Sequence, residues 1–244
     1  MKSLLLLLSF FISTALFAQD DSTWKEASKE SQAYHQYRQH LTYPSYGYDK
    51  INQLIKKQVV TDSDDNLVMK DKTYTTLSLR EKFTYTMLHG EAFNQNCDAM
   101  PPIQDEQTKI FGYLPDAFNE FTWSDRQNQF LTDNRDSVMA WIKESVSKTN
   151  RIGINYKLAL EQINAKEMIP FLVSVYNKQR KDYDILTLLM LLMKDGNYSA
   201  FAGTATYKKL YGDNSNYQDF ILANKANQDL IIKRATDYYN GLKK

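Results

Sequence analysis

Apolar residues recur at intervals of three and four along most of this chain, which places them on one face of an α-helix. Glycine and proline interrupt helices, and they number only 8 and 5 in 244 residues. The pattern predicts an all-α fold, an irregular helical bundle. The expected helices cover residues 23–41, 51–59, 78–90, 136–146 and 225–240, with further helical turns at 91–97, near 105, after 115 and from 124, while 67–77 is expected to form a small hairpin or an ordered loop.

Several helix starts carry the capping-box spacing, in which a Ser or Thr side chain and a Glu or Gln three residues later satisfy each other's backbone amides. The pairs are Thr23 with Glu26, Ser78 with Glu81, and Ser124 with Gln127. In the last expected helix, Leu230, Ile231 and Ala235 are predicted to point inward.

The C-terminal third contains four consecutive helical patterns joined by short turns, at residues 154–163, 166–177, 183–193 and 199–211. Aligning Leu158 with Leu189 gives a period of about 31 residues, which is typical of stacked helix pairs. The stretch 159–172 is predicted to form a helix, a polar turn and a second helix that contains the pair Ile169-Pro170. This order resembles a HEAT-type repeat, and the resemblance covers residues 152–211. The resemblance implies antiparallel helix pairs. The second unit departs from the family at Phe201 and Gly203, where the proline and a large apolar residue are missing.

The first eighteen residues have the composition of a secretory signal peptide. Lys2 precedes an apolar run from Leu4 to Phe17, and the small residue Ala18 stands at the junction. We therefore expect an exported protein, periplasmic or extracellular, with cleavage after residue 18. The mature chain is divided into N-terminal helices and a connecting loop at 19–77 and a main helical domain at 78–244, which are expected to form one continuous domain.

Charge and cysteine content narrow the function classes. The chain has 30 basic and 29 acidic residues, and removal of residues 1–18 takes Lys2 away, so the mature charge is near zero. Nucleic acid is not an expected partner, because phosphate binding needs clustered positive charge. A single cysteine, Cys97, excludes an intrachain disulfide. No apolar segment after the signal peptide is long enough to predict a membrane span.

The residues His89, Glu91 and Cys97 are the catalytic candidates. An imidazole that activates a thiol, with a carboxylate to orient it, would give a nucleophile for hydrolysis. Asp98, in the same polar loop, could replace Glu91 beside His89. The competing interpretation is that Cys97 is a small buried hydrophobic residue.

A group of tyrosines after the first expected helix forms the ligand-binding candidate. Tyr43, Tyr46 and Tyr48 could stack on sugar rings or anchor a partner protein. The alternative is that these rings fill a turn, while Tyr34 and Tyr37 dock the first helix onto the body.

No cofactor or metal motif is present in the sequence. Asp62, Asp64 and Asn66 match the first ligand positions of a calcium loop, but Leu67 replaces its glycine and Thr73 its bidentate glutamate. The segment is therefore expected to be a solvated acidic turn.

These observations favour an exported helical protein that acts as a protein- or ligand-interaction module or scaffold, with a protein or glycan as partner. The alternatives are a hydrolase with dispersed catalytic residues around His89, Glu91 and Cys97, and a structural envelope protein without a ligand.

Overall fold

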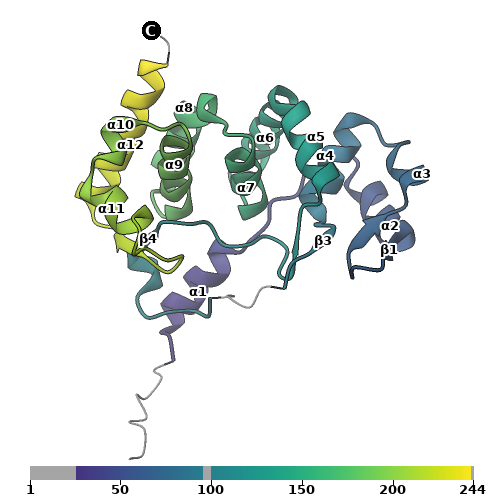
Figure 1. Ribbon diagram of the computed structural model, residues 1–244, viewed down its shortest axis with the longest axis horizontal. Coiled ribbons are helices and arrows are strands. Elements are labelled where there is room, and N and C mark those ends of the chain that lie inside the picture. The colour runs from purple at the N-terminus through teal and green to yellow at the C-terminus, as the bar shows by residue number, and fades with distance from the viewer. Residues whose placement is uncertain (1–25, 96–99, 243–244) are drawn as a thin grey trace, which may run out of the picture.

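The structure of the protein is a computed structural model that describes residues 26–95 and 100–242. Helices dominate it, which confirms the all-α class (Figure 1). The α-helices of the first half are α1 (Lys29–Arg38), α2 (Tyr48–Gln58), α3 (Asp71–Tyr74), α4 (Leu79–Leu88) and α5 (Asp125–Asp133). Those of the second half are α6 (Arg135–Thr149), α7 (Ile154–Gln162), α8 (Ile169–Gln179), α9 (Tyr183–Asp195), α10 (Ser199–Ala202), α11 (Ala205–Tyr211) and α12 (Lys225–Gly241).

Short strands and 3-10 turns connect these helices. The strands form three antiparallel pairs: β1 (Val59–Thr61) with β2 (Leu67–Met69), β3 (Ala92–Phe93) with β5 (Phe121–Thr122), and β4 (Lys109–Phe111) with β6 (Phe220–Leu222). The 3-10 turns are η1 (Glu106–Thr108) and η2 (Lys166–Met168). The pair of β4 and β6 joins segments more than one hundred residues apart.

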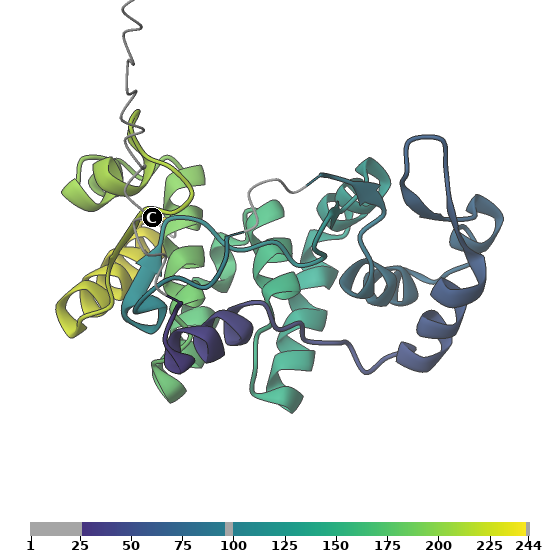
Figure 2. The ribbon, with the colours of Figure 1, turned by 90° about the horizontal axis from the view of Figure 1, so that it is seen from below.

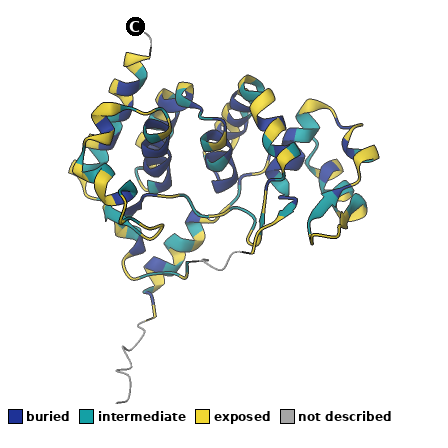
Figure 3. Ribbon diagram, in the orientation of Figure 1, coloured by how far each residue is buried: buried dark blue, intermediate teal, exposed yellow. Residues whose placement is uncertain are grey.

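Helix α9 is the centre of the C-terminal body. It packs against α7, α8, α12 and β4, and ten of its residues, from Asp184 to Met193, are buried. Figure 3 shows α9 and α7 mostly dark blue, with exposed residues on the outer helices. A helix that is apolar on nearly all sides needs neighbours all round, and this arrangement supplies them.

A second, smaller core lies at the other end of the molecule, beyond α5 in Figure 1. Its buried apolar residues are Ile51, Met69, Tyr74, Leu77 and Tyr85. They come from α2, the β1–β2 hairpin, the segment around α3, and α4. We call residues 47–77 together with α4 the N-terminal lobe.

Helix α1 does not pack with this lobe, although it precedes it in the chain. It lies across the C-terminal body, where Figure 2 shows it in purple, and it contacts η1. The Arg38 guanidinium donates to both oxygens of Asp184 at 3.0 and 3.2 Å and to Glu106 at 2.9 Å, and all three side chains are buried. The Tyr34 hydroxyl accepts from the Tyr183 amide at 3.2 Å. These contacts tie α1 to the start of α9.

The predicted helix over 23–41 is too long. Within the described residues it begins at Lys29, where Ser28 caps the Ser31 amide, and Thr23 lies outside them. After Arg38 the chain extends along Gly153 and Asn155, whose amide side chain bonds both backbone groups of Thr42. A Cβ on Gly153 would lie 2.2 Å from the Thr42 nitrogen, so only glycine permits this approach.

Other expectations have mixed outcomes. The capping boxes at Ser78 and Ser124 are confirmed. The helical turns expected at 91–97 and after 115 are wrong as far as the structure describes these segments, to residue 95 in the first, because β3 and β5 pair there. Those near 105 are limited to η1 before β4. Leu230 is exposed rather than inward, because α12 buries Ile231, Ala235 and Tyr238. No helix in the described ranges is long and apolar enough to cross a membrane.

Candidate functional site

One irregular segment, residues 112–120, forms a wall shared by two surface clefts. Its ends are fixed: the Tyr211 hydroxyl donates to the Gly112 carbonyl at 2.9 Å, and the Asn94 amide donates to the Glu120 carbonyl at 2.7 Å. Asn119 has φ of 55°, a left-handed conformation that Asn adopts more readily than most residues. The segment is thereby held in one path between β4 and β5.

Gly90 allows the second end of this segment to lie close to the end of α4. A Cβ at this position would lie 2.9 Å from both Phe118 Cδ2 and the Thr122 carbonyl oxygen. The indole of Trp123, just beyond, donates to the Thr86 carbonyl at 2.7 Å. Glycine and tryptophan together fix the wall against α4.

The larger cleft, about 850 Å³, lies between this wall and the C-terminal end of α1. Three half-exposed tyrosines line it: Tyr43, Tyr113 and Tyr217, at 44%, 36% and 41% exposure. Its polar lining includes His35, His40, Gln39, Asn119 and Glu120. Arg38 also contributes to the lining, but its charge is already met by Asp184 and Glu106.

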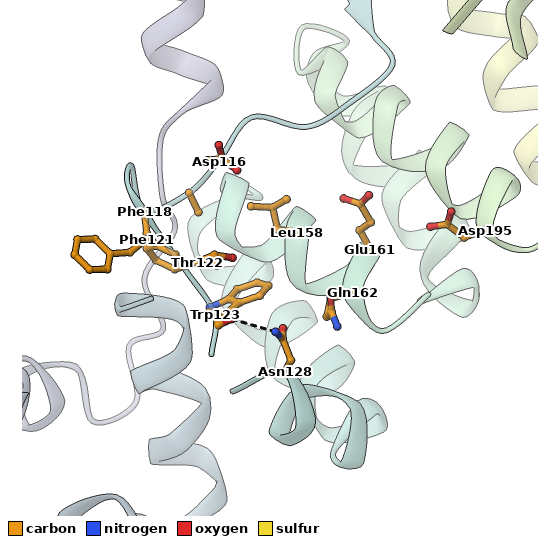
Figure 4. A pocket seen from close by; sticks show the side chains of 11 residues that line it. Asp116, Phe118, Phe121, Thr122, Trp123, Asn128, Leu158, Glu161, Gln162 and Asp195 are labelled. Atoms are coloured by element: carbon orange, nitrogen blue, oxygen red, sulfur yellow. Dashed lines mark hydrogen bonds between the residues drawn. The ribbon is translucent and has the colours of Figure 1, made fainter. Parts of the chain in front are cut away.

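The smaller cleft, about 440 Å³, lies on the other side of the same wall and shares Asp116 and Ala117 with the first. In Figure 4, Leu158 and Glu161 of α7 and Asp195 of α9 face it from one side, and Asp116, Phe118 and Trp123 from the other. Asn128 donates to the Trp123 carbonyl at 3.1 Å and helps to fix the floor. We call the two adjoining clefts the groove.

Four carboxylates line the groove, and the guanidinium in its lining, that of Arg38, is already paired. Asp116, Glu120, Glu161 and Asp195 line it, and Lys194 is paired with Asp195 at 3.1 Å. Burial, with a smaller contribution from Asp195, raises the pKa of Glu161 to about 7. A positively charged ligand group is therefore the complementary one.

The predicted catalytic residues occupy a different place, where the N-terminal lobe meets α5. Glu91 is fully buried and accepts from the Tyr85 and Ser124 hydroxyls at 2.6 Å each and from Arg126 Nε at 2.8 Å. Burial alone would raise the pKa of Glu91, but the bonds from Arg126, Ser124 and Tyr85 outweigh it and lower the pKa. Both oxygens of Glu91 therefore accept hydrogen bonds, and the carboxylate links α4 to α5.

His89 lies beside this network with its own partner. Its Nε2 donates to the Leu67 carbonyl at 2.6 Å, and burial lowers the pKa of the ring. Cys97 and Asp98 lie outside the described residues, so the hydrolase built on His89, Glu91 and Cys97 stays a prediction. Neither His89 nor Glu91 lines the groove.

The three candidate tyrosines separate into two environments. Tyr43 lines the groove, and its ring lies 5.6 Å from that of Tyr48. Tyr46 is equally exposed but lies under the Arg80 guanidinium, 4.6 Å from ring centre to Cζ, and lines neither cleft. Only Tyr43 of the three reaches the larger cleft.

The acidic turn at 62–66 is held by its own polar groups. Asp62 accepts from the Asp64 and Asn66 amides at 2.9 and 3.0 Å, and these bonds, with that from the Asn66 side chain, lower its pKa. Among the described residues, no group of three His, Cys, Asp or Glu side chains is arranged to hold a metal ion.

No protein-family model, curated protein or solved structure matches this chain.

Several groove residues escape sequence analysis. Tyr113, Tyr217 and Glu161 come from segments far apart in the chain, and each resembles an ordinary loop or helix residue in its local pattern. Near the wall, Pro115 is the local sequence signal, and it predicts the start of a helix. In the structure Pro115 lies in irregular backbone instead.

Proposed function

We propose that the protein is an exported interaction module that binds an extended segment of a partner protein in the groove. The observation that carries this proposal is the pair of clefts that share Asp116 and Ala117 in their lining, with exposed tyrosines along one and carboxylates along the other. Export itself rests on residues 1–18, which lie outside the described residues.

The tyrosine rim supports protein recognition. Tyrosine is enriched among residues that dominate binding energy, because a rigid ring supplies contact area at little entropic cost. Tyr43, Tyr113 and Tyr217 are the rings that present such area here.

The charge of the groove favours a peptide over a glycan. Tyrosine rings suit both classes, but an excess of carboxylates complements lysine and arginine side chains, whereas a neutral glycan has no charge to match it. A glycan is the other partner that the tyrosines allow, and it is an outcome of the test.

Selection from a random dodecapeptide phage library tests the proposal. We expect the wild-type protein to enrich peptides containing basic residues, and the variant Tyr43→Ala/Tyr113→Ala/Tyr217→Ala to lose affinity for them by about tenfold or more. Tyr46→Ala is the matched control, since Tyr46 has the same exposure outside the groove. Absence of enrichment, or binding to a glycan array that depends on the same three tyrosines, would refute the peptide proposal.

A HEAT-type pairing of the helices over 152–211 is also proposed. It is supported by the short turns between α7, α8 and α9 and by the packing of both α7 and α8 on α9. An experimental structure in which the α7–α8 pair superposes on the pair formed by α9 and α11 would support it, and unrelated crossing angles would contradict it.

A further inference from the structure

The smaller cleft contains a carboxylate for which the protein provides no close donor. Glu161 lies on the last turn of α7, partly buried, and no described residue donates a hydrogen bond to its side chain. The groups in its surroundings are the carboxylates Asp116 and Asp195, the ammonium of Lys194, and the buried phenol of Tyr211.

Asp195 and Lys194, the charges that act on Glu161, offset each other and leave the charge of Glu161 itself unbalanced. Lys194 is the cation that acts on Glu161, and its ammonium is already 3.1 Å from Asp195. Removing a carboxylate from water is unfavourable unless an opposite charge or a donor replaces the water. The cleft, about 440 Å³, has room for such a group.

The walls of the cleft suit the methylene stem of a long basic side chain. Leu158, Phe118 and the edge of Trp123 supply apolar surface beside the carboxylates, as Figure 4 shows. Lysine and arginine combine an apolar stem with a charged head, so they match both parts of this lining.

We propose that the smaller cleft is the specificity pocket for a lysine or arginine side chain of the bound peptide, with Glu161 as its counter-charge. This rests on the proposed function of the groove and names the residue type that the partner segment presents.

Proton release accompanies binding in this arrangement. Glu161 is largely protonated below neutral pH, because burial and Asp195 raise its pKa to about 7. An incoming ammonium favours the ionised carboxylate, so binding lowers the pKa of Glu161. Affinity for a basic side chain is therefore expected to increase between pH 5.5 and pH 8, by up to about tenfold per pH unit below the pKa.

Two small probes test the pocket without a selected peptide. One is Nα-acetyl-L-lysine N-methylamide, and the other is the norleucine analogue, which has the same stem without the charge. NMR of protein labelled with ¹³C at glutamate carboxyls follows the titration of Glu161 with and without each probe.

The lysine probe is expected to lower the measured pKa of Glu161 and to bind more tightly at pH 8 than at pH 5.5, while the norleucine probe does neither. Glu161→Gln removes this binding, and Glu30→Gln, an exposed change on α1, retains it. If Glu161→Gln fails to fold, the carboxyl titration of the wild-type protein still decides the question.

Equal binding of the two probes, no binding of the lysine probe, or a Glu161 pKa that does not move overturns the pocket proposal. The proposed function fails separately. Library peptides whose binding depends on Tyr43, Tyr113 and Tyr217 but that show no preference for basic residues would support the groove as a peptide site and refute the specificity pocket. Absence of any selected peptide would refute the groove as a peptide site.

Discussion

The C-terminal body and the N-terminal lobe are stabilised in different ways. The body surrounds α9 with a continuous apolar core, which α4 of the lobe enters through Phe83 and Met87. The lobe also buries five apolar residues of its own, and the Glu91–Arg126 ion pair joins it to α5. Arg126 also donates to the Met69 carbonyl and to Asp71 in the lobe, at 2.7 and 2.8 Å. The comparison teaches that apolar packing around α9 fixes the body and one face of α4, whereas the bonds of Arg126 fix the β1–β2 hairpin and the start of α3.

The strongest test of the apolar body is Leu189→Ala in α9. Leu189 is fully buried, and its truncation leaves a cavity, so we expect a loss of about 3–5 kcal/mol in the free energy of unfolding. Urea denaturation measures this loss. Leu230→Ala, at an exposed position of α12, is the control and is expected to change stability by less than about 0.5 kcal/mol. Comparable losses for both variants would show that α9 is not the centre of the core.

The charged junction is tested by Arg126→Ala. The substitution leaves the buried Glu91 carboxylate without its counter-charge, which costs about 3 kcal/mol. Amide hydrogen exchange should accelerate in residues 48–77 much more than in α9, because the hairpin and α3 lose the bonds that Arg126 makes to Met69 and Asp71.

Arg180→Ala is the matched control for this junction, since Arg180 pairs with Asp229 at the surface. We expect a change below about 1 kcal/mol from it. Uniform acceleration of exchange over the whole chain in Arg126→Ala would contradict a lobe held locally by charge.

Glu161→Gln tests whether a carboxylate without a hydrogen-bond donor weakens the body. Burial and the nearby Asp195 raise the pKa of Glu161 from 4.5 to about 7, so the folded state retains a proton that the unfolded chain releases. Stability is therefore lost as pH rises through this window, and glutamine removes the loss.

The variant is expected to be more stable than the wild-type protein at pH 8, by on the order of 2 kcal/mol at most, and about equal at pH 4. Thermal unfolding at both pH values measures the difference. A variant that is destabilised at pH 8 would mean that the ionised carboxylate has a stabilising partner.

The smallest effect is expected for Lys50→Ala in the lobe. Lys50 pairs with Glu81, but its side chain is 60% exposed, so the pair contributes less than about 0.5 kcal/mol. Urea denaturation of the variant compared with Arg126→Ala separates exposed from buried charge. A loss above 1 kcal/mol would show that surface pairs also hold the lobe.

The same contrast explains how far the sequence predicts the fold. In the body, the dense apolar residues predict α6, α7, α8, α9 and α12, because each of these helices carries in its own sequence the apolar residues that it buries. Short strands escape such prediction. Lys109–Phe111 pairs with Phe220–Leu222, so neither segment has enough local pattern to indicate a strand.

The candidate site is predicted less well than the fold. Of the ligand-binding candidates predicted from the sequence, Tyr43 lies in the larger cleft. Glu91, a catalytic candidate, instead accepts hydrogen bonds where the lobe meets α5. The raised pKa of Glu161 comes from burial and from the nearby Asp195, and both depend on how α7 and α9 pack. Such tertiary effects have no signal in a single segment of sequence.

The most direct test of the central claim is to map the amide shifts of the protein on addition of a dodecapeptide selected from the phage library. The account predicts that the largest shifts fall in residues 38–43 and 112–122, which line the two clefts, and that α12 and the β1–β2 hairpin change little. Shifts concentrated on the lobe or on the outer face of α12, with the groove unperturbed, would contradict it.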